Sequence, residues 1–161
     1  AWMAGLPDMI TFTHRDRRYA VIHGGVSDVS RFLWPTSTFE EFREEIDLIR
    51  THVEDLYQVI AGHCGIAFSR LIDATPWVNA GAIGMPAHDG TRVLRYILVR
   101  EGRMSLWDAE YDHEAAHAAM VEAGLTQGYH QALLTGYWPS EDVLPPELRR
   151  DAPDRWSLES G

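Results

Sequence analysis

The chain has 161 residues, a formal net charge of −10 and a hydrophobic content of 45%. Its length allows one compact domain with a hydrophobic core, and none of its apolar runs approaches the roughly 18 residues that a membrane span needs. The acidic balance argues against binding to nucleic-acid polymers or anionic membranes, because both favour basic surfaces. A single cysteine excludes an internal disulfide and, in a sequence without a secretory-type opening, predicts a cytoplasmic protein.

Two short β-type runs, at residues 9–13 and 19–22, flank a polar turn near the start of the chain. This pattern predicts a hairpin whose second strand ends at His23, in a glycine-containing loop. Large aromatic side chains follow at 32–34 without a clear period. We expect them to tuck under the loop, and the alternative is a lid over a site with Arg31 facing an anion.

A helix is predicted from about residue 38, where Thr38 with Glu41, or Ser37 with Glu40, forms a capping box. Apolar residues at helical spacing mark its buried face: Phe39, Phe42, Ile46, Ile49 and Val53. Acidic residues lie off that stripe and are expected to face solvent: Glu40, Glu41, Glu44, Glu45 and Asp47.

The middle of the chain alternates short strand-type runs with turns, which favours an α+β or sandwich arrangement. Strands are predicted at 56–61, 68–72, 77–79, 93–99 and 105–107. The first of them ends at Gly62 and His63. The run at 93–99 is apolar on both faces apart from Arg95, so we expect that strand to be covered on both sides.

Two helices are predicted near the end of the chain. Asp112 can cap a helix over 113–123, and a shorter helix over 128–135 ends at Gly136. From Trp138 onward, prolines and charged residues predict a tail that wraps the surface or frays.

The first candidate site lies on the first of these helices. His113, Glu114 and His117 satisfy the HExxH pattern, in which two histidines on one helix face bind zinc and the glutamate acts as general base. Glu141 is the candidate third ligand. Two helix stops and a proline separate it from His117, so a zinc protease is the less favoured hypothesis.

The second candidate site pairs His23 with His63. Each follows a β-type run and neighbours glycine, which lets a metal ion and its substrate approach the backbone. Neutral imidazoles suit zinc, manganese or iron, although two ligands do not complete a site. The nearest loop carboxylates are Asp28 and Asp89. Cys64 is expected to be a small buried residue rather than a thiolate ligand.

Three segments around these histidines resemble the calcineurin-like metallophosphoesterases. They are Ile22-His23-Gly24, the run from Ile60 through Gly65, and the run from Trp77 through Pro86 followed by Asp89-Gly90. The likeness covers about residues 6–99 and is to the C-terminal half of a small bacterial branch of phosphodiesterases and diadenosine tetraphosphatase-related proteins. It implies that residues 1–111 are half of a four-layer αββα sandwich, with 112–161 a helical extension packed on the same domain.

The resemblance also implies an activity. Family members hold two metal ions, here Mn, Fe or Zn, bridged by a carboxylate, and they activate a bridging hydroxide to hydrolyse a phosphomonoester or phosphodiester. By this likeness His23 and His63 bind the same ion. Arg31, Arg70 and Asn79 are the candidate substrate-binding residues. The expected partner is a small phosphorylated substrate, such as a dinucleoside polyphosphate, and a homo-oligomer is compatible with the sequence.

The chain departs from the family in two respects. The Asp-x-His, Gly-Asp and Gly-Asn-His/Asp motifs are absent and are expected to precede Ala1, so no catalytic residue is identified within the chain. The family's Gly-His-x-His motif has Gly65 at its last position, which predicts a weakened or differently ligated first metal site. The alternative function is a non-catalytic binding or regulatory module derived from a phosphoesterase.

Overall fold

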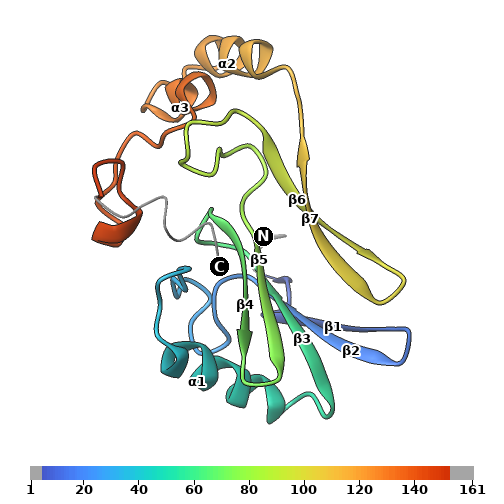
Figure 1. Cartoon of the computed structure of the whole chain (residues 1–161). Helices are drawn as coiled ribbons and strands as arrows, with labels where there is room; N and C mark the ends of the chain where they lie inside the picture. Colours follow the sequence, from blue (N-terminus) through green and yellow to red (C-terminus); the bar gives the residue numbers. More distant parts are fainter. Residues whose placement is uncertain (1–4, 153–161) are drawn as a thin grey trace. The chain divides into compact units, whose positions relative to one another are not determined.

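A computed structural model describes residues 5–152 (Figure 1). Contacts between residues divide the described chain into two compact units. The first contains the residues up to Ile83 together with Arg95–Ala109. The second contains Gly84–Leu94 and the residues from Glu110 onward. We describe each unit by itself.

A five-stranded sheet forms the centre of the first unit. Its strands are β1 (Met9–His14), β2 (Arg17–Ile22), β3 (Leu56–Ala61), β4 (Ala67–Ile72) and β5 (Thr75–Ala80), in the spatial order β1-β2-β3-β5-β4. The three central strands, β2, β3 and β5, run parallel, whereas β1 and β4 pair antiparallel at the edges. The carboxyl ends of the central strands therefore meet at one edge of the sheet. The hairpin predicted to deliver His23 is confirmed.

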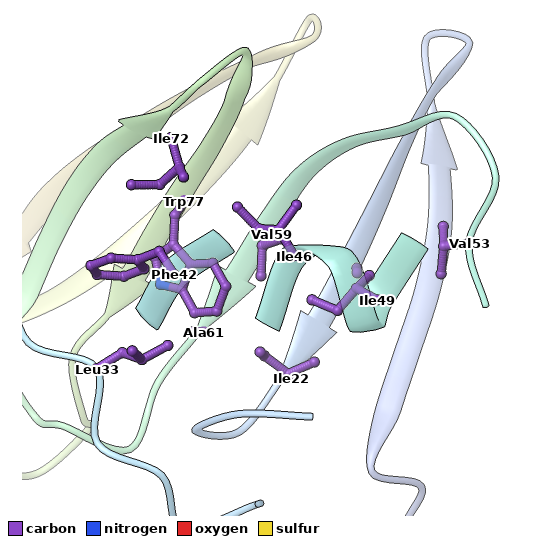
Figure 2. Packing of buried hydrophobic residues seen from close by; sticks show 11 residues of the cluster. Ile22, Leu33, Phe42, Ile46, Ile49, Val53, Val59, Ala61, Ile72 and Trp77 are labelled. Carbon is purple, nitrogen blue, oxygen red and sulfur yellow. The ribbon is translucent and has the colours of Figure 1, made fainter. Parts of the chain in front are cut away.

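Helix α1 (Phe39–Arg50) lies along one face of this sheet (Figure 1). Thr38 caps it in a capping box with Glu41, the first of the two predicted pairs. Its buried side chains pack on those of β2, β3 and β5 in one hydrophobic core (Figure 2). Fully buried members of that core include Phe42, Ile49 and Trp77.

Two predictions about α1 are wrong. Phe39 was expected on the buried stripe, yet it is 46% exposed and lies beneath the guanidinium group of Arg70. Glu45 was expected to face solvent, yet it is 0% exposed. The carboxylate of Glu45 turns inward because backbone and side-chain donors from the loop after β2 surround it.

Strands β6 (Leu94–Arg100) and β7 (Arg103–Ala109) form a separate two-stranded sheet. We expected β6 to be covered on both faces, but Tyr96 is 43% and Leu98 is 39% exposed. Exposed and half-buried residues alternate along β6, because it lies in a two-stranded sheet with β7 and not in the five-stranded sheet that packs on α1. The hairpin tip is fixed within the first unit, because the amide of Gly102 donates to Nε2 of His14 at 3.1 Å.

The second unit contains α2 (His113–Glu122), α3 (Tyr129–Thr135) and the short 3₁₀ helix η2 (Pro146–Leu148). Asp112 caps α2 and Gly136 ends α3, as the sequence predicted. None of the helices within residues 5–152 has the length and apolar content needed to cross a membrane.

The segment after α3 is mostly exposed but held by buried side chains, so residues 138–152 follow the surface-wrapping form of the predicted tail and not the frayed one. Trp138, Leu144 and Leu148 are buried. A buried histidine fixes this segment, because Nδ1 of His88 accepts from the Trp138 amide at 2.9 Å. Nε2 of His88 therefore carries the proton and donates to Glu141 at 2.5 Å.

Candidate metal centre

The two histidines singled out in the sequence meet at the carboxyl edge of the parallel strands. His23 directly follows β2, and His63 lies two residues after β3. Nδ1 of His63 is 3.0 Å from Nε2 of His23, and the ring planes are inclined by 64°. This edge is where open sheets of parallel strands bind ligands, because backbone pairing stops there and loop side chains converge.

Backbone and amide hydrogen bonds connect the three strand ends. The amide of Gly62 donates to the carbonyl of His23 at 2.7 Å, which joins the ends of β2 and β3. Asn79 joins β3 to β5, because its Nδ2 donates to the Gly62 carbonyl and its Oδ1 accepts from the Gly81 amide at 2.9 Å. Asn79 is 1% exposed, so in this structure it braces the loop that carries His63 against the end of β5.

His63 lies in a partly buried environment. Its ring packs on Phe32, with the ring centroids 4.3 Å apart. Burial and then the neighbouring His23 lower the pKa of His63, against the opposing effects of Ser30 and Asp28. The Nε2 atom is buried without a well-formed hydrogen bond. His63 is therefore neutral at pH 7, the state in which an imidazole can bind a metal ion.

The loop after β2 is held by a carboxylate that the sequence analysis placed in solvent. Oε2 of Glu45 accepts from the amides of Val26 at 2.6 Å and Ser27 at 3.1 Å. Oε1 accepts from the Ser27 hydroxyl and from Nη1 of Arg31, the latter at 2.7 Å. Burial by itself would raise the pKa of Glu45, but these hydrogen bonds hold it below its usual value. Nothing in the sequence of the helix itself indicates that Glu45 holds this loop.

Comparisons with known proteins bear on the fold. No family model and no curated protein matches the sequence. The chain superposes on a hypothetical protein from Pyrococcus horikoshii OT3 with a TM-score of 0.68 and 13% identity, covering 84% of this chain and 53% of that one. It also superposes on a metallophosphoesterase from Sphaerobacter thermophilus with a TM-score of 0.64 and 18% identity, covering 84% and 61%. The chain has the metallophosphoesterase fold.

This finding confirms the predicted α+β class and the metallophosphoesterase type of architecture. At identities of 13% and 18%, the likeness concerns the fold alone. The chain spans 53% and 61% of the lengths of the two solved structures.

The metallophosphoesterase fold implies a divalent metal ion, and the two histidines fit one. Two nitrogens that each lie about 2.0–2.1 Å from one ion are no more than about 4.2 Å apart. The observed 3.0 Å between Nδ1 of His63 and Nε2 of His23 is within that limit, and it also suits a hydrogen bond between the two rings without metal. Within residues 5–152, no group of three His, Cys, Asp or Glu side chains is close enough to hold an ion. The pair therefore needs further ligands.

The neighbouring loop residues do not supply them. Gly65 has no side chain, and its φ of +75° lies in the left-handed region that favours glycine over histidine. Asp28 uses its Oδ1 atom to accept from the amide and hydroxyl of Ser30. Gly65 therefore offers no ligand to the histidine pair, and its backbone conformation is itself typical of glycine.

Cys64 is 1% exposed, as the sequence predicted, and burial raises the pKa of its thiol to about 12. At pH 8 the thiol is therefore protonated and unsuited to metal binding. We expect the native protein to react with a thiol reagent such as Ellman's reagent at least about 100-fold more slowly than the urea-unfolded protein. Reaction of the native thiol at the rate of the unfolded one would contradict its burial.

The two predicted phosphate clamps have protein partners in the structure. Arg31 pairs with Glu44 at 2.9 Å and with Glu45 at 2.7 Å. Arg70 donates to the carbonyls of Pro35 and Ser37, so it braces the segment before α1. Contact of either arginine with substrate stays a prediction.

The HExxH residues lie in α2 without the expected third ligand. His113 contacts Arg92, with Nε2 3.3 Å from Nη1, and His117 stacks on His130 with ring centroids 5.5 Å apart. Glu141, the proposed third ligand, instead accepts from His88 and from the Arg150 amide. These contacts give no support to the zinc-protease hypothesis.

Proposed function

We propose that this chain supplies two metal ligands of a phosphoesterase centre that hydrolyses a small phosphomonoester or phosphodiester. The observation that carries the proposal is the convergence of Nε2 of His23 and Nδ1 of His63, 3.0 Å apart, at the carboxyl edge of a metallophosphoesterase fold. Neutral imidazoles favour zinc, manganese or iron over magnesium and calcium. A dinucleoside polyphosphate is the finer substrate proposal, and the lone reduced cysteine is compatible with a cytoplasmic location.

Each residue of the centre has a separate task. A bound divalent ion would polarise a phosphoryl oxygen and lower the pKa of a bound water. His23 and His63 would hold the ion through nitrogens, and the hydrogen bond from the Gly62 amide to the His23 carbonyl keeps the two strand ends in register. The side-chain amide of Asn79, at the end of β5, donates to the carbonyl of Gly62 and fixes its position. The phosphate would lie over this edge, and Arg31 lies in the loop that follows His23.

The proposal is tested on the protein as its own cells produce it and, in parallel, on the 161-residue chain. Both are stripped with a chelator and reloaded with Mn²⁺, Fe²⁺ or Zn²⁺. We expect metal-dependent hydrolysis of bis(p-nitrophenyl) phosphate. We also expect His63→Ala to weaken metal binding, measured by calorimetry, by at least about 100-fold, because loss of a ligand costs more affinity than loss of a residue that only orients one.

Two histidine substitutions serve as controls. His52 follows α1 and is exposed, so His52→Ala should leave metal affinity and turnover unchanged. His117→Ala should also change neither, whereas a zinc protease would lose its metal. Equal metal affinity in wild type and His63→Ala would rule out the proposed centre.

Gly65 favours a second candidate, a binding module that has kept the fold without turnover. The loop offers no histidine at that position, and the neutral thiol of Cys64 does not replace it. Metal binding that depends on His63, without hydrolysis under any of the metals, would select this candidate over the phosphoesterase.

A further inference from the structure

We infer that Glu45 is a positioning residue of the two-histidine centre, acting through the loop from Gly24 to Phe32. The inference rests on the proposed function, because it concerns the same centre. Glu45 lies on α1 and does not contact either histidine. It holds the loop that connects His23 to Phe32, and both of these residues contact the ring of His63.

The first step is the saturation of the Glu45 carboxylate. It is 0% exposed, and each oxygen accepts two hydrogen bonds, from the amides of Val26 and Ser27 and from the Ser27 hydroxyl and Arg31. An apolar side chain at a buried position commonly stabilises a fold as well as a buried ion pair does. A carboxylate with all its partners on one loop is therefore suited to fixing the conformation of that loop.

The second step is the tight fold of the loop itself. The amides of Gly25 and Arg31 both donate to the Asp28 carbonyl, at 3.1 and 3.0 Å. A Cβ atom on Gly24 would lie 2.6 Å from the Arg31 carbonyl, so the two ends of the loop are in direct backbone contact. A Cβ atom on Gly25 would lie 3.0 Å from the Glu45 carboxylate. A shift at Glu45 would therefore be transmitted along the loop.

The third step connects the loop ends to the metal centre. His23 places Nε2 3.0 Å from Nδ1 of His63, and Phe32 packs its ring 4.3 Å from the ring of the same histidine. Because His63 is contacted from both ends of one loop, the conformation of that loop sets the relative placement of the two imidazoles.

Glu44 provides a matched control. It is the preceding residue on α1 and also pairs with Arg31, at 2.9 Å. Its side chain is 64% exposed, and no hydrogen bond connects it to a loop amide. Glu44→Gln also removes one negative charge that pairs with Arg31, and it leaves the hydrogen bonds from Val26 and Ser27 to Glu45 intact.

The experiment compares Glu45→Gln with Glu44→Gln in the full chain. In Glu45→Gln an amide NH₂ group replaces one carboxylate oxygen, so a donor then faces donors of the loop. We expect the Mn²⁺ or Zn²⁺ dissociation constant to rise about 10-fold to 100-fold in Glu45→Gln, as for other residues that orient ligands, and less than about 2-fold in Glu44→Gln. Affinities are measured under solution conditions in which circular dichroism shows that each variant is folded.

A second readout separates this inference from the proposed function. In the metal-free protein we expect Glu45→Gln to shift the imidazole ¹⁵N resonances of His23 and His63, with those of His52 unchanged. If wild type binds no metal, the proposed function fails while these shifts still test the positioning role. Unchanged resonances together with unchanged affinity in Glu45→Gln would overturn the inference.

A milder variant covers the case in which Glu45→Gln does not fold. Ser27→Ala removes the hydroxyl, which donates to Glu45 and accepts from Arg31 at 3.4 Å, and keeps the hydrogen bond from the Ser27 amide to Glu45. We expect the same resonances to shift in the same direction, by less. Absence of any shift in a folded Ser27→Ala protein would then overturn the inference.

Discussion

Phe42→Ala is expected to lower the free energy of unfolding by about 3–5 kcal/mol, a large part of the 5–15 kcal/mol typical of a domain. Phe42 is 0% exposed, and its ring meets Trp77 edge-on with centroids 5.2 Å apart and planes inclined by 72°. It contacts Phe68 in the same way at 6.1 Å. Alanine would leave a cavity between α1 and the sheet that the surrounding side chains can fill only in part.

Phe39→Ala is the matched control for this prediction. Both phenylalanines lie on α1 beneath the guanidinium group of Arg70, at 4.7 Å for Phe39 and 4.8 Å for Phe42. Because Phe39 is 46% exposed, its loss should cost no more than about 1 kcal/mol. Urea unfolding followed by circular dichroism measures both. Equal losses would mean that both rings are buried, as the sequence pattern alone suggested.

The error over Phe39 and Glu45 shows what helical periodicity can resolve. With 3.6 residues per turn, each lies about 60° around the helix axis from Phe42, on opposite sides. The helical period therefore places both residues at the margin of the apolar stripe. Side-chain polarity alone then predicts that Phe39 is buried and Glu45 is exposed. The surface that packs against the helix determines which of the two side chains is buried. The loop after β2 presents amides and Arg31 on the side of Glu45.

The histidine pair could be predicted because it depends on local signals. Each histidine follows a strand-type run beside glycine, and the order of strands and helix favours parallel neighbours with their ends at one edge. Contacts between loops could not be predicted in this way. Nothing local indicates that Asn79 donates to the Gly62 carbonyl.

HExxH illustrates the opposite case, in which a local pattern is present but its surroundings do not complete the site. His113 and His117 do lie on one helix, as predicted. Glu141, the carboxylate that was expected to complete the site, accepts a hydrogen bond from His88 instead. A spacing of four residues places two histidines on one face, but a metal site also needs ligands from elsewhere in the chain.

Glu45→Gln is expected to lower the free energy of unfolding by about 2–4 kcal/mol at pH 7, because it removes a charged acceptor from buried donors. The effect should depend on pH in a defined direction. Hydrogen bonds hold the pKa of folded Glu45 below the 4.5 that is usual for a glutamate, so the unfolded state binds the proton more tightly. Its contribution to stability is therefore fully present above about pH 4.5 and is lost as pH falls through the folded pKa.

The measurement is the difference in unfolding free energy between wild type and Glu45→Gln, from urea titrations at pH 7, 4.5 and 3. Other carboxylates with lowered pKa values, such as Asp28 and Asp73, are present in both proteins and cancel in the difference. Arg31 and its second partner Glu44 face the same carboxylate, so Glu44→Gln is titrated in parallel. We expect a difference that shrinks toward pH 3 for Glu45→Gln and stays below about 1 kcal/mol throughout for Glu44→Gln. A difference independent of pH would show that the charged form of Glu45 is not what holds the loop.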